Sequence, residues 1–272
     1  MTLNAPAGLV DCDDQVHDAQ GSVNCQGGAP NTQDFAGITF VKIEGSSYTF
    51  GSPADQLNRK SNEHQQVIPL NHTFWISKYE ISQGEWMSAM GSNPSAFKQL
   101  GPDMNAPVEN ITWHQAKAFV DQLNQTAGDT HFRLPAETEW EYVAKAGTSS
   151  AWSFGSLVQN LSQYTHRDGL AYPRDKGLKL PNSLGVYDLY GNVYEWCEDW
   201  YVSRAAQGVC LPGTGTFKVI RGGSNGATSE WLRSSSRNFT NPDHHAYYIG
   251  LRLVYVEDPT QDPYQQQAPC GF

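Results

Sequence analysis

The stretch GVYDLYGNVYEWCEDWY, residues 185–201, interleaves apolar and aromatic residues with glycine, aspartate and asparagine. Apolar segments this short, separated by turn residues, predict short strands and turns rather than a helix. Within it, Asp188 and Glu195 stand seven residues apart, with Gly191 and Val193 between them. Carboxylates interspersed with backbone carbonyls suit a hard cation such as Ca²⁺. The alternative is that these residues only form turns, which aspartate and asparagine favour in any case.

Short strands are also expected on both sides of this stretch. Downstream, FKVIRGGS (217–224) and YIGLRLVYV (248–256) are rich in β-branched and aromatic residues, and little helix is expected beyond residue 150. Upstream, FAGITFVKIEGSSYTFGS (35–52) predicts a strand, a glycine turn and a second strand that pair as a hairpin. The stretch HTFWISKYEIS (72–82) alternates apolar and polar residues as a further strand does.

Three segments predict helices. In residues 82–91, Ser82 is the expected N-cap and Glu85 completes a capping box. Residues 111–128 are the clearest helix, with Thr112 as its N-cap and Gly128 at its end, and residues 132–147 form another that Gly147 stops. The expected buried stripes of the two longer helices are Ala116, Phe119, Val120 and Leu123 in the first, and Trp140, Val143 and Ala144 in the second.

Together these elements predict one α+β domain over residues 36–256, preceded by a polar N-terminal arm (1–35) and followed by a short tail (257–272). The 272 residues include 8 Trp, 13 Tyr and 11 Phe, which is ample material for a packed core. The formal net charge of −10 repels phosphate backbones, so we expect no nucleic-acid partner. A small molecule or a peptide is the expected ligand.

No apolar stretch approaches the roughly 18 residues needed to span a bilayer, so no transmembrane segment is expected. The opening MTLNAPAGLVDCDDQ lacks the charged start and apolar core of a signal peptide. A mature exported chain that had been given a new Met1 would look the same, so the opening leaves export undecided.

The five cysteines bear on the compartment. Cys12, Cys25, Cys210 and Cys270 lie in polar or Gly/Pro-rich segments, which favours disulfides, whereas Cys197 lies between two tryptophans in EWCEDW. We therefore predict the pairs Cys12–Cys25 and Cys210–Cys270 and a buried free thiol at Cys197. Such pairs imply an oxidising compartment, so the chain is expected to be exported, to the periplasm. The alternative is five free thiols in a cytosolic protein.

Four motifs follow one another along the chain: FRLPAETEWEYVAKAG (132–147), LGVYDLYGNVYEWCEDWY (184–201), VIRGGS (219–224) and RSSSRN…GLRLV (233–254). Their order and spacing resemble the formylglycine-generating-enzyme (sulfatase-modifying factor) family. The resemblance runs from about residue 38 to residue 255. It implies that family's variant of the C-type lectin fold, with a twisted antiparallel sheet, two helices and much irregular loop.

The resemblance also implies structural Ca²⁺. One family site maps onto Asp188, the carbonyls of Gly191 and Val193, and Glu195. A second maps onto Asn160, the Leu161 carbonyl, Asp168 and the Leu170 carbonyl, with a connector that is shorter than in the family.

Members of the family that generate formylglycine carry two cysteines after the GGS motif, where they bind copper. The matching positions in this sequence are Ala227 and, for the second cysteine, a position near Leu232. Copper(I) needs thiolate or comparable ligands, and neither side chain supplies one. We therefore expect no copper site and no formylglycine generation, and the sequence identifies no other redox cofactor.

The segment 225–248 holds the remaining candidates. His244, His245 and Glu230 are candidate proton-transfer residues, because imidazole and carboxyl groups suit acid–base catalysis. The two histidines are adjacent, so on a strand they would point to opposite faces. The alternatives are a solvated aromatic loop, and arginines that only tie loops together, above all Arg221 and Arg252. The candidate ligand-binding residues are Asn225, Trp231, Arg233, Arg237, Tyr247 and Tyr248.

Two functions are therefore in competition. The first is an exported oxidative tailoring enzyme, similar in kind to a periplasmic family member without copper cysteines that acts in maturation of the siderophore pyoverdine, where a peptide-borne chromophore is oxidised. The second is a non-catalytic ligand-binding or display protein, because the same fold serves as a scaffold for diversified surface loops.

Overall fold

The structure is a computed structural model that describes residues 31–99, 104–166, 172–203 and 214–264, and the backbone of two short paired strands, β1 (Val16–His17) and β2 (Val23–Asn24). Four predicted disulfide cysteines, Cys12, Cys25, Cys210 and Cys270, lie outside the residues so described. Cys197 is fully buried and carries a free thiol, as expected.

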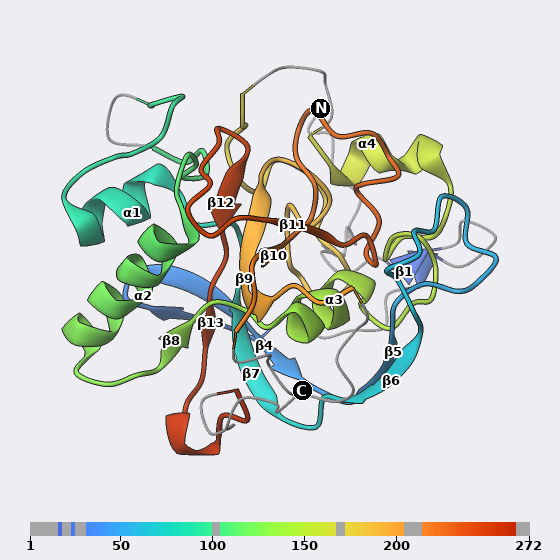
Figure 1. The fold of residues 1–272 in the computed structure, drawn as a ribbon, viewed down its shortest axis with the longest axis horizontal. Helices are drawn as coiled ribbons and strands as arrows, with labels where there is room; N and C mark the ends of the chain where they lie inside the picture. The colour runs from blue at the N-terminus through green and yellow to red at the C-terminus, as the bar shows by residue number, and fades with distance from the viewer. Residues whose placement is uncertain are drawn as a thin grey trace, which may run out of the picture.

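A five-stranded antiparallel sheet forms the lower part of the view in Figure 1. Its order is β3 (Thr32–Phe35), β4 (Ile38–Glu44), β7 (Thr73–Ser77), β13 (Val254–Tyr255) and β8 (Phe132–Arg133). The link between β3 and β4 is a two-residue turn in which Ala36 and Gly37 have φ of 52° and 77°, the left-handed conformation that tight hairpins need.

A second sheet of four strands carries the functional segments. Its order is β11 (Asn238–Thr240), β10 (Lys218–Arg221), β9 (Tyr194–Trp200) and β12 (Ile249–Leu251), with β12 parallel to β9. The stretch 248–256 thus supplies one strand to each large sheet, because Arg252 and Leu253 carry the chain from β12 to β13.

The hairpin expected within residues 35–52 is wrong, although both of its strands exist. β4 pairs with β3 and β7, whereas β5 (Ser47–Phe50) pairs with β6 (Gln66–Pro69) in a separate two-stranded sheet. A side chain at Gly45 would meet the Leu70 carbonyl oxygen at 2.2 Å, so this glycine lets the chain pass close to another segment as it leaves the first sheet.

Two predicted helices are confirmed with their caps. α1 (Gln83–Met90) starts at Ser82, whose hydroxyl accepts from the Glu85 N–H, and ends at Gly91. α2 (Trp113–Ala127) starts at Thr112, ends at Gly128 and buries its predicted stripe of Ala116, Phe119, Val120 and Leu123.

The third helix is shorter than expected. α3 spans Glu137–Lys145, because Phe132–Arg133 are extended as β8 and Pro135 precedes the helix. Its left-handed end falls at Ala146, with φ of 45°, one residue before the predicted Gly147. The remaining helical turns are short: η1 (Val158–Asn160), α4 (Leu161–Tyr164) and η2 (Pro259–Gln261).

Two apolar clusters fill the interior. One packs α3, through Trp140, against β4 to β7, and the other packs α1 and α2 against β9. In the second cluster the rings of Trp86 and Phe119 stack with their centroids 4.8 Å apart. The α+β architecture is confirmed.

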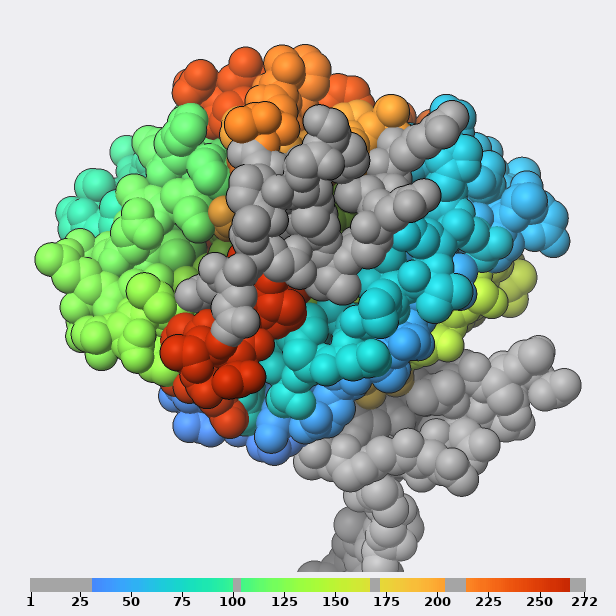
Figure 2. Space-filling view, turned by 60° about the horizontal axis from the view of Figure 1, so that its bottom comes forward, coloured from blue at the N-terminus to red at the C-terminus, as the bar shows by residue number. Residues whose placement is uncertain are grey.

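Both ends of the described chain contact this core. Residues 32–35, at the end of the expected N-terminal arm, form β3, and Asp262 of the expected tail pairs with Arg133 at 2.6 Å. In Figure 2 the C-terminal stretch (red) lies against the cyan segment on that face of the molecule, in agreement with the bond from Trp75 Nε1 to Glu257 Oε1 at 2.9 Å. Among the described helices, none is both long and apolar enough to cross a membrane.

Candidate functional site

An exposed cluster of aromatic rings forms where loops from distant parts of the chain meet beside β9 and β12. The Phe97 ring lies 5.6 Å from that of Tyr247 and 5.8 Å from that of Tyr172, and Tyr247 lies 5.1 Å from Tyr248. Phe97, Tyr172 and Tyr247 are 40%, 40% and 43% exposed. These four residues, called the aromatic cluster below, offer ring faces and edges to a planar or peptidic ligand.

Asn225 lies directly behind this cluster. Its backbone N–H donates to the Asn192 carbonyl at 3.0 Å, and its side-chain Nδ2 donates to the Tyr172 carbonyl at 2.8 Å. Its Oδ1 is buried and has no hydrogen-bond partner in the described part of the chain. A buried acceptor without a partner is costly, so this oxygen is suited to receive a donor from a ligand or from water.

A buried carboxylate holds the Phe97 loop in place. Glu109 accepts from the N–H groups of Phe97 and Ala96 at 2.7 and 3.1 Å, and Gln83 Nε2 donates to the Phe97 carbonyl at 3.0 Å. Burial raises the pKa of Glu109 above its ordinary value, and the two N–H donors work in the opposite direction. The loop is therefore positioned by polar side chains before any ligand binds.

The two candidate catalytic histidines lie on the exposed loop that also carries Tyr247. His245 Nδ1 is 2.9 Å from Asn110 Oδ1, and the His244 backbone N–H donates to the Asn241 carbonyl at 2.9 Å. Both side chains are exposed, so they stand at the rim of the site, and their acid–base role stays a prediction.

Glu230 and Trp231, by contrast, belong to a different surface. Lys60 Nζ lies 3.8 Å from Glu230 and 4.7 Å from the centroid of the Trp231 ring. Trp231 and Arg237 line a pocket to which no residue of the aromatic cluster contributes. The structure thus divides the candidates of segment 225–248 into two groups instead of one cleft.

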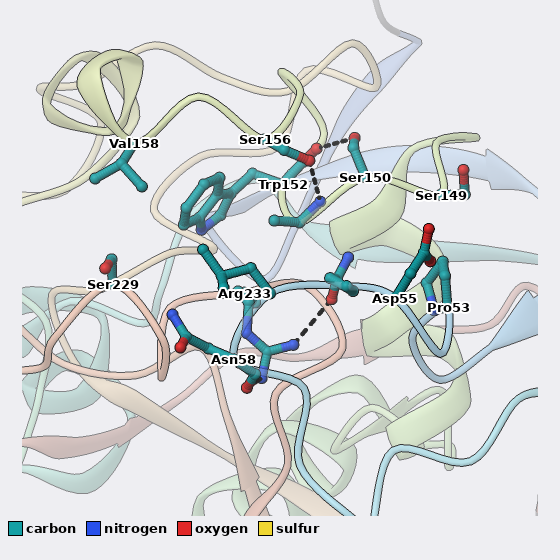
Figure 3. Close-up of a pocket in the computed structure, with 13 residues that line it drawn as sticks. Pro53, Asp55, Asn58, Ser149, Ser150, Trp152, Ser156, Val158, Ser229 and Arg233 are labelled. Carbon is teal, nitrogen blue, oxygen red and sulfur yellow. Dashed lines mark hydrogen bonds between the residues drawn. The ribbon is translucent and has the colours of Figure 1, made fainter.

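Arg233 and Arg237 are almost fully buried, at 2% exposure each, and their donors are occupied. Arg233 makes a two-pronged ion pair with Glu63 at 2.6 and 2.7 Å while lying at the wall of a pocket of about 310 Å³ (Figure 3). Arg237 pairs with Glu137 at 2.6 and 2.7 Å. Burial raises the pKa of Glu137, but Arg237, followed by Arg221, holds it below its ordinary value. These two arginines tie loops to the core, and their ligand-binding role stays a prediction.

Arg221 and Arg252 have the structural role that was expected as the alternative. Arg221 pairs with Glu141 at 2.6 Å. Arg252 donates through Nε and Nη2 to Glu195 and through Nη1 to the Ser77 carbonyl, each at 2.8 Å. Arg252 therefore joins β7 of one sheet to β9 of the other.

The first predicted calcium site offers one carboxylate oxygen that is free. Asp188 Oδ2 accepts from the Gly177 N–H at 2.7 Å, and its buried Oδ1 has no partner among the described residues. Burial raises the pKa of Asp188 to about 6. Both oxygens of Glu195 face Arg252, and Oε2 also accepts from Trp140 Nε1 at 2.6 Å. Asp188 therefore fits a cation, and Glu195 does not while Arg252 holds it.

The Gly191 and Val193 carbonyls stay predicted ligands. Around them, a side chain at Gly191 would meet Thr165 Oγ1 at 2.3 Å, and the Val193 N–H donates to Glu80 at 3.1 Å. Asn160 ends η1 and Leu161 is buried in α4, whereas Asp168 and Leu170 lie outside the described residues. Where the chain is described, no group of three or more His, Cys, Asp or Glu side chains is arranged to hold a metal.

Of the two positions that correspond to the copper cysteines, one is buried and the other is partly buried. Leu232 is fully buried, and Ala227 packs against the Trp140 core cluster. Burial, followed by the nearby charge of Asp199, raises the pKa of the Cys197 thiol well above its ordinary value, so it stays protonated. A protonated buried thiol is a poor copper ligand.

Sequence reasoning missed Phe97 and Tyr172, which complete the aromatic cluster. Each is a single aromatic residue in a polar loop close to a proline, in NPSAFKQ and LAYPRD. A ring in an irregular loop near a proline belongs to no periodic apolar face, and this position is the signal that could have marked it as a surface contact.

Comparison with known proteins places the chain among relatives of one family. A profile of the sulfatase-modifying factor enzyme 1-like domain matches residues 28–256. The chain is 27% identical over 260 residues to the chaperone protein LppX of Paenibacillus barcinonensis, a match that covers 72% of this chain and 84% of LppX. It is 31% identical over 201 residues to the formylglycine-generating enzyme of Streptomyces coelicolor, covering 64% of this chain and 62% of that enzyme. The matched region thus spans less than two thirds of that enzyme's length.

Two solved structures share the fold at a TM-score of 0.74. They are Treponema denticola variable protein 1 and PvdO from Pseudomonas aeruginosa, each 24% identical, with 84% of this chain and 99% of the other covered. The expected fold, the formylglycine-generating-enzyme variant of the C-type lectin fold, is thereby confirmed.

Proposed function

Since the chain belongs to the sulfatase-modifying factor enzyme 1-like family, we propose that it is a peptide-tailoring protein of this fold that does not generate formylglycine. Its substrate is a siderophore-type peptide that carries a chromophore, and this chromophore is matured by oxidation, as in pyoverdine. The observation that carries the proposal is the buried Asn225 Oδ1, which has no partner among the described residues and lies behind the exposed aromatic cluster, two residues before Ala227.

The aromatic cluster supplies the chemistry of peptide recognition. A planar chromophore stacks on the ring of Tyr172, Phe97 or Tyr247, because the face of one aromatic ring attracts the edge or the offset face of another. The proposal includes a shift of these rings that opens the buried Asn225 Oδ1. A peptide N–H then donates to this oxygen, which removes the cost of leaving the acceptor without a partner. The binding of an aromatic peptide thus uses both unusual features of the site.

Oxidation by copper thiolates is not part of the proposal, because Ala227 and Leu232 stand near the positions where formylglycine-generating relatives carry their cysteines. We place the reaction outside the cytoplasm, in line with the predicted disulfides. Cell fractionation with a specific antibody tests this location.

The decisive experiment uses the purified chain and a synthetic precursor peptide with its chromophore unoxidised. Calorimetric titration should show binding that Tyr247→Ala weakens roughly tenfold, while Leu178→Ala, a change at another exposed apolar residue, has no effect. A deletion strain should accumulate the unoxidised precursor. Unchanged metabolites together with no peptide binding would exclude the proposal.

A second candidate is a non-catalytic binding protein on the same scaffold. The exposure of the aromatic cluster favours it, since a surface patch recognises a partner without enclosing a reacting group. One similar protein, LppX, is named as a chaperone. Peptide binding without any turnover, combined with an unchanged metabolite profile in the deletion strain, would favour this alternative.

A further inference from the structure

A second pocket, separate from the aromatic cluster, lies at one edge of the four-stranded sheet. It forms where the chain leaves β9 at Tyr201 and where β11, the edge strand, presents Phe239. Its volume is about 460 Å³, within the range of roughly 300–1,000 Å³ typical of small-ligand sites. We call it the edge pocket. The lining residues that matter here are Lys60, His64, Tyr201, Trp231, Arg237 and Phe239.

Aromatic rings form the walls of the edge pocket. Tyr201 and Phe239 stack with centroids 4.0 Å apart and planes 24° from parallel, and Phe239 remains 38% exposed. Trp231 also lines the pocket, with Lys60 Nζ 4.7 Å from its ring centroid. Walls of this kind select a flat, apolar ring.

A buried cross-link fixes the shape of the pocket. Arg237 donates to the carbonyls of Asn62 and Val202 at 3.0 and 3.2 Å, so it joins the two loops that flank the pocket. Its guanidinium carbon lies 5.1 Å from the centroid of the Tyr201 ring, and Glu137 balances its charge. The pocket is therefore formed in advance, which lowers the entropy cost of binding.

Two polar side chains of the pocket have a donor that a ligand can use. Tyr201 OH accepts from Asn62 Nδ2 at 3.0 Å, which leaves its own proton available to a ligand. Lys60 meets Glu230 at only 3.8 Å, with both side chains about one-third exposed, and such a pair contributes little. Lys60 is thus able to exchange Glu230 for an anion from the ligand. Because Glu137 holds Arg237, Lys60 is the positively charged side chain of this lining that a ligand anion can reach.

We propose that the edge pocket binds an aromatic carboxylate. The ring lies between Trp231 and the Tyr201–Phe239 pair, and the carboxylate accepts from Lys60 Nζ and Tyr201 OH. A free aromatic acid and the C-terminal aromatic residue of a peptide share this chemistry. The edge pocket has no residue in common with the aromatic cluster, so each site can fail its test without affecting the other.

The test compares matched ligands by calorimetric titration of the purified full-length chain. N-acetyl-L-tryptophan should bind about tenfold or more tightly than N-acetyl-L-tryptophanamide, which has the same ring without the charge. Gly-Gly-Trp with a free C-terminus and its amide form a second matched pair. If Gly-Gly-Trp binds more tightly than N-acetyl-L-tryptophan, the ligand is the end of a peptide. If it binds more weakly, the ligand is a free acid.

Three variants locate the ligand. Lys60→Met should remove the preference for the acid, Phe239→Ala should weaken both ligands roughly tenfold, and Lys179→Met, at a lysine outside the pocket, should change neither. If the thermal melt shows that Phe239→Ala does not fold, Tyr201→Phe takes its place. This variant keeps the ring but loses the hydroxyl, so it should weaken binding of the acid and not of the amide. Equal affinity for acid and amide overturns the proposal, as does acid binding that survives Lys60→Met or that Tyr247→Ala abolishes.

Discussion

Asn225 donates from Nδ2 to the carbonyl oxygen of Tyr172 at 2.8 Å, while its Oδ1 is buried and has no partner in the part of the chain that the structure describes. The Asn225 side chain thus fixes a loop that carries an exposed ring, and it holds a buried acceptor beneath that loop. Ala227, which matches a copper-cysteine position of formylglycine-generating relatives, follows two residues later. The same loop segment therefore supplies a hydrogen bond where the related enzymes supply thiolates.

Replacing Asn225 tests this arrangement. Asn225→Ala removes the tether of Tyr172 and the free acceptor, so we expect affinity for the aromatic precursor peptide to fall roughly tenfold, as for one or two neutral hydrogen bonds. Calorimetric titration measures this change, and Asn71→Ala, at an exposed amide in the link between β6 and β7, is the control. Equal affinities for wild type and Asn225→Ala would show that the ligand does not reach this oxygen.

No formylglycine should form when the purified chain receives copper(I), oxygen and a sulfatase-type peptide. Copper(I) requires soft ligands, and Ala227 and Leu232 supply only hydrocarbon. Mass spectrometry of the peptide detects the loss of the cysteine sulfur, with the Streptomyces coelicolor enzyme as the positive control. A converted peptide would mean that another cysteine of this chain reaches the site.

The buried pair of Arg237 and Glu137 should dominate the stability of the loops around the edge pocket. Arg237→Ala leaves the Glu137 charge buried without its main partner, a change that costs about 3–5 kcal/mol in comparable pairs. Urea denaturation should show this loss, whereas Lys42→Ala, at a more exposed pair with Glu44 of 3.5 Å, should cost less than about 1 kcal/mol. Similar losses in both variants would contradict the structural role of Arg237.

Asp199 should make the stability depend on pH. Burial and the charge of Glu137 raise the pKa of Asp199 from 3.8 to about 7 in the folded chain. Because the pKa of Asp199 is higher in the folded chain than in the unfolded chain, the protonated carboxyl stabilises the fold. This contribution is complete below about pH 4 and is lost as the pH rises through 7. Asp199→Asn keeps an acceptor for the Glu137 N–H and should raise the melting temperature by about 2–4 °C at pH 8.

The gain in melting temperature from Asp199→Asn should disappear near pH 4, because the wild-type carboxyl is then protonated and is as uncharged as the amide. Thermal melts of both proteins between pH 4 and pH 8 measure it. A difference that does not change with pH would assign the effect to packing instead of to the charge.

Calcium should act through Asp188 if the predicted structural ion binds there. An ion at 100 times its dissociation constant stabilises by about 2.7 kcal/mol, so chelation should lower the melting temperature. Asp188→Asn should abolish that response, since an amide is a weaker calcium ligand, while asparagine suits the φ of 59° at this position. Identical melting curves with and without chelator, after the ion has been shown to be removed, would end the calcium interpretation.

The sequence was sufficient wherever the determining contacts are local. Ser82 and Glu85 are three residues apart, so the cap of α1 can be recognised within a single turn. The stripe of α2 repeats at helical spacing, and burial then follows from periodicity. The four ordered motifs were likewise enough to predict the family and the fold, because each is a contiguous stretch.

Tertiary structure alone decided how these elements combine. The hairpin expected in residues 35–52 failed because β4 pairs with β7, about 30 residues further on, and register between distant strands leaves no local signal. Glu195 was predicted as a calcium ligand from its spacing to Asp188 and from the family resemblance, and the sequence did not show that Arg252, 57 residues away, faces both of its oxygens.

The site shows the same division most clearly. Residue types in segment 225–248 indicated a binding surface, and only the folded chain separates Trp231 and Glu230 from Tyr247 and Asn225. It also adds Phe97 and Tyr172, whose rings meet Tyr247 or each other across long stretches of sequence. The physical reason is that an aromatic ring on a loop gains its partners from packing between distant segments, whereas caps and periodic stripes are satisfied within a few residues of their own position.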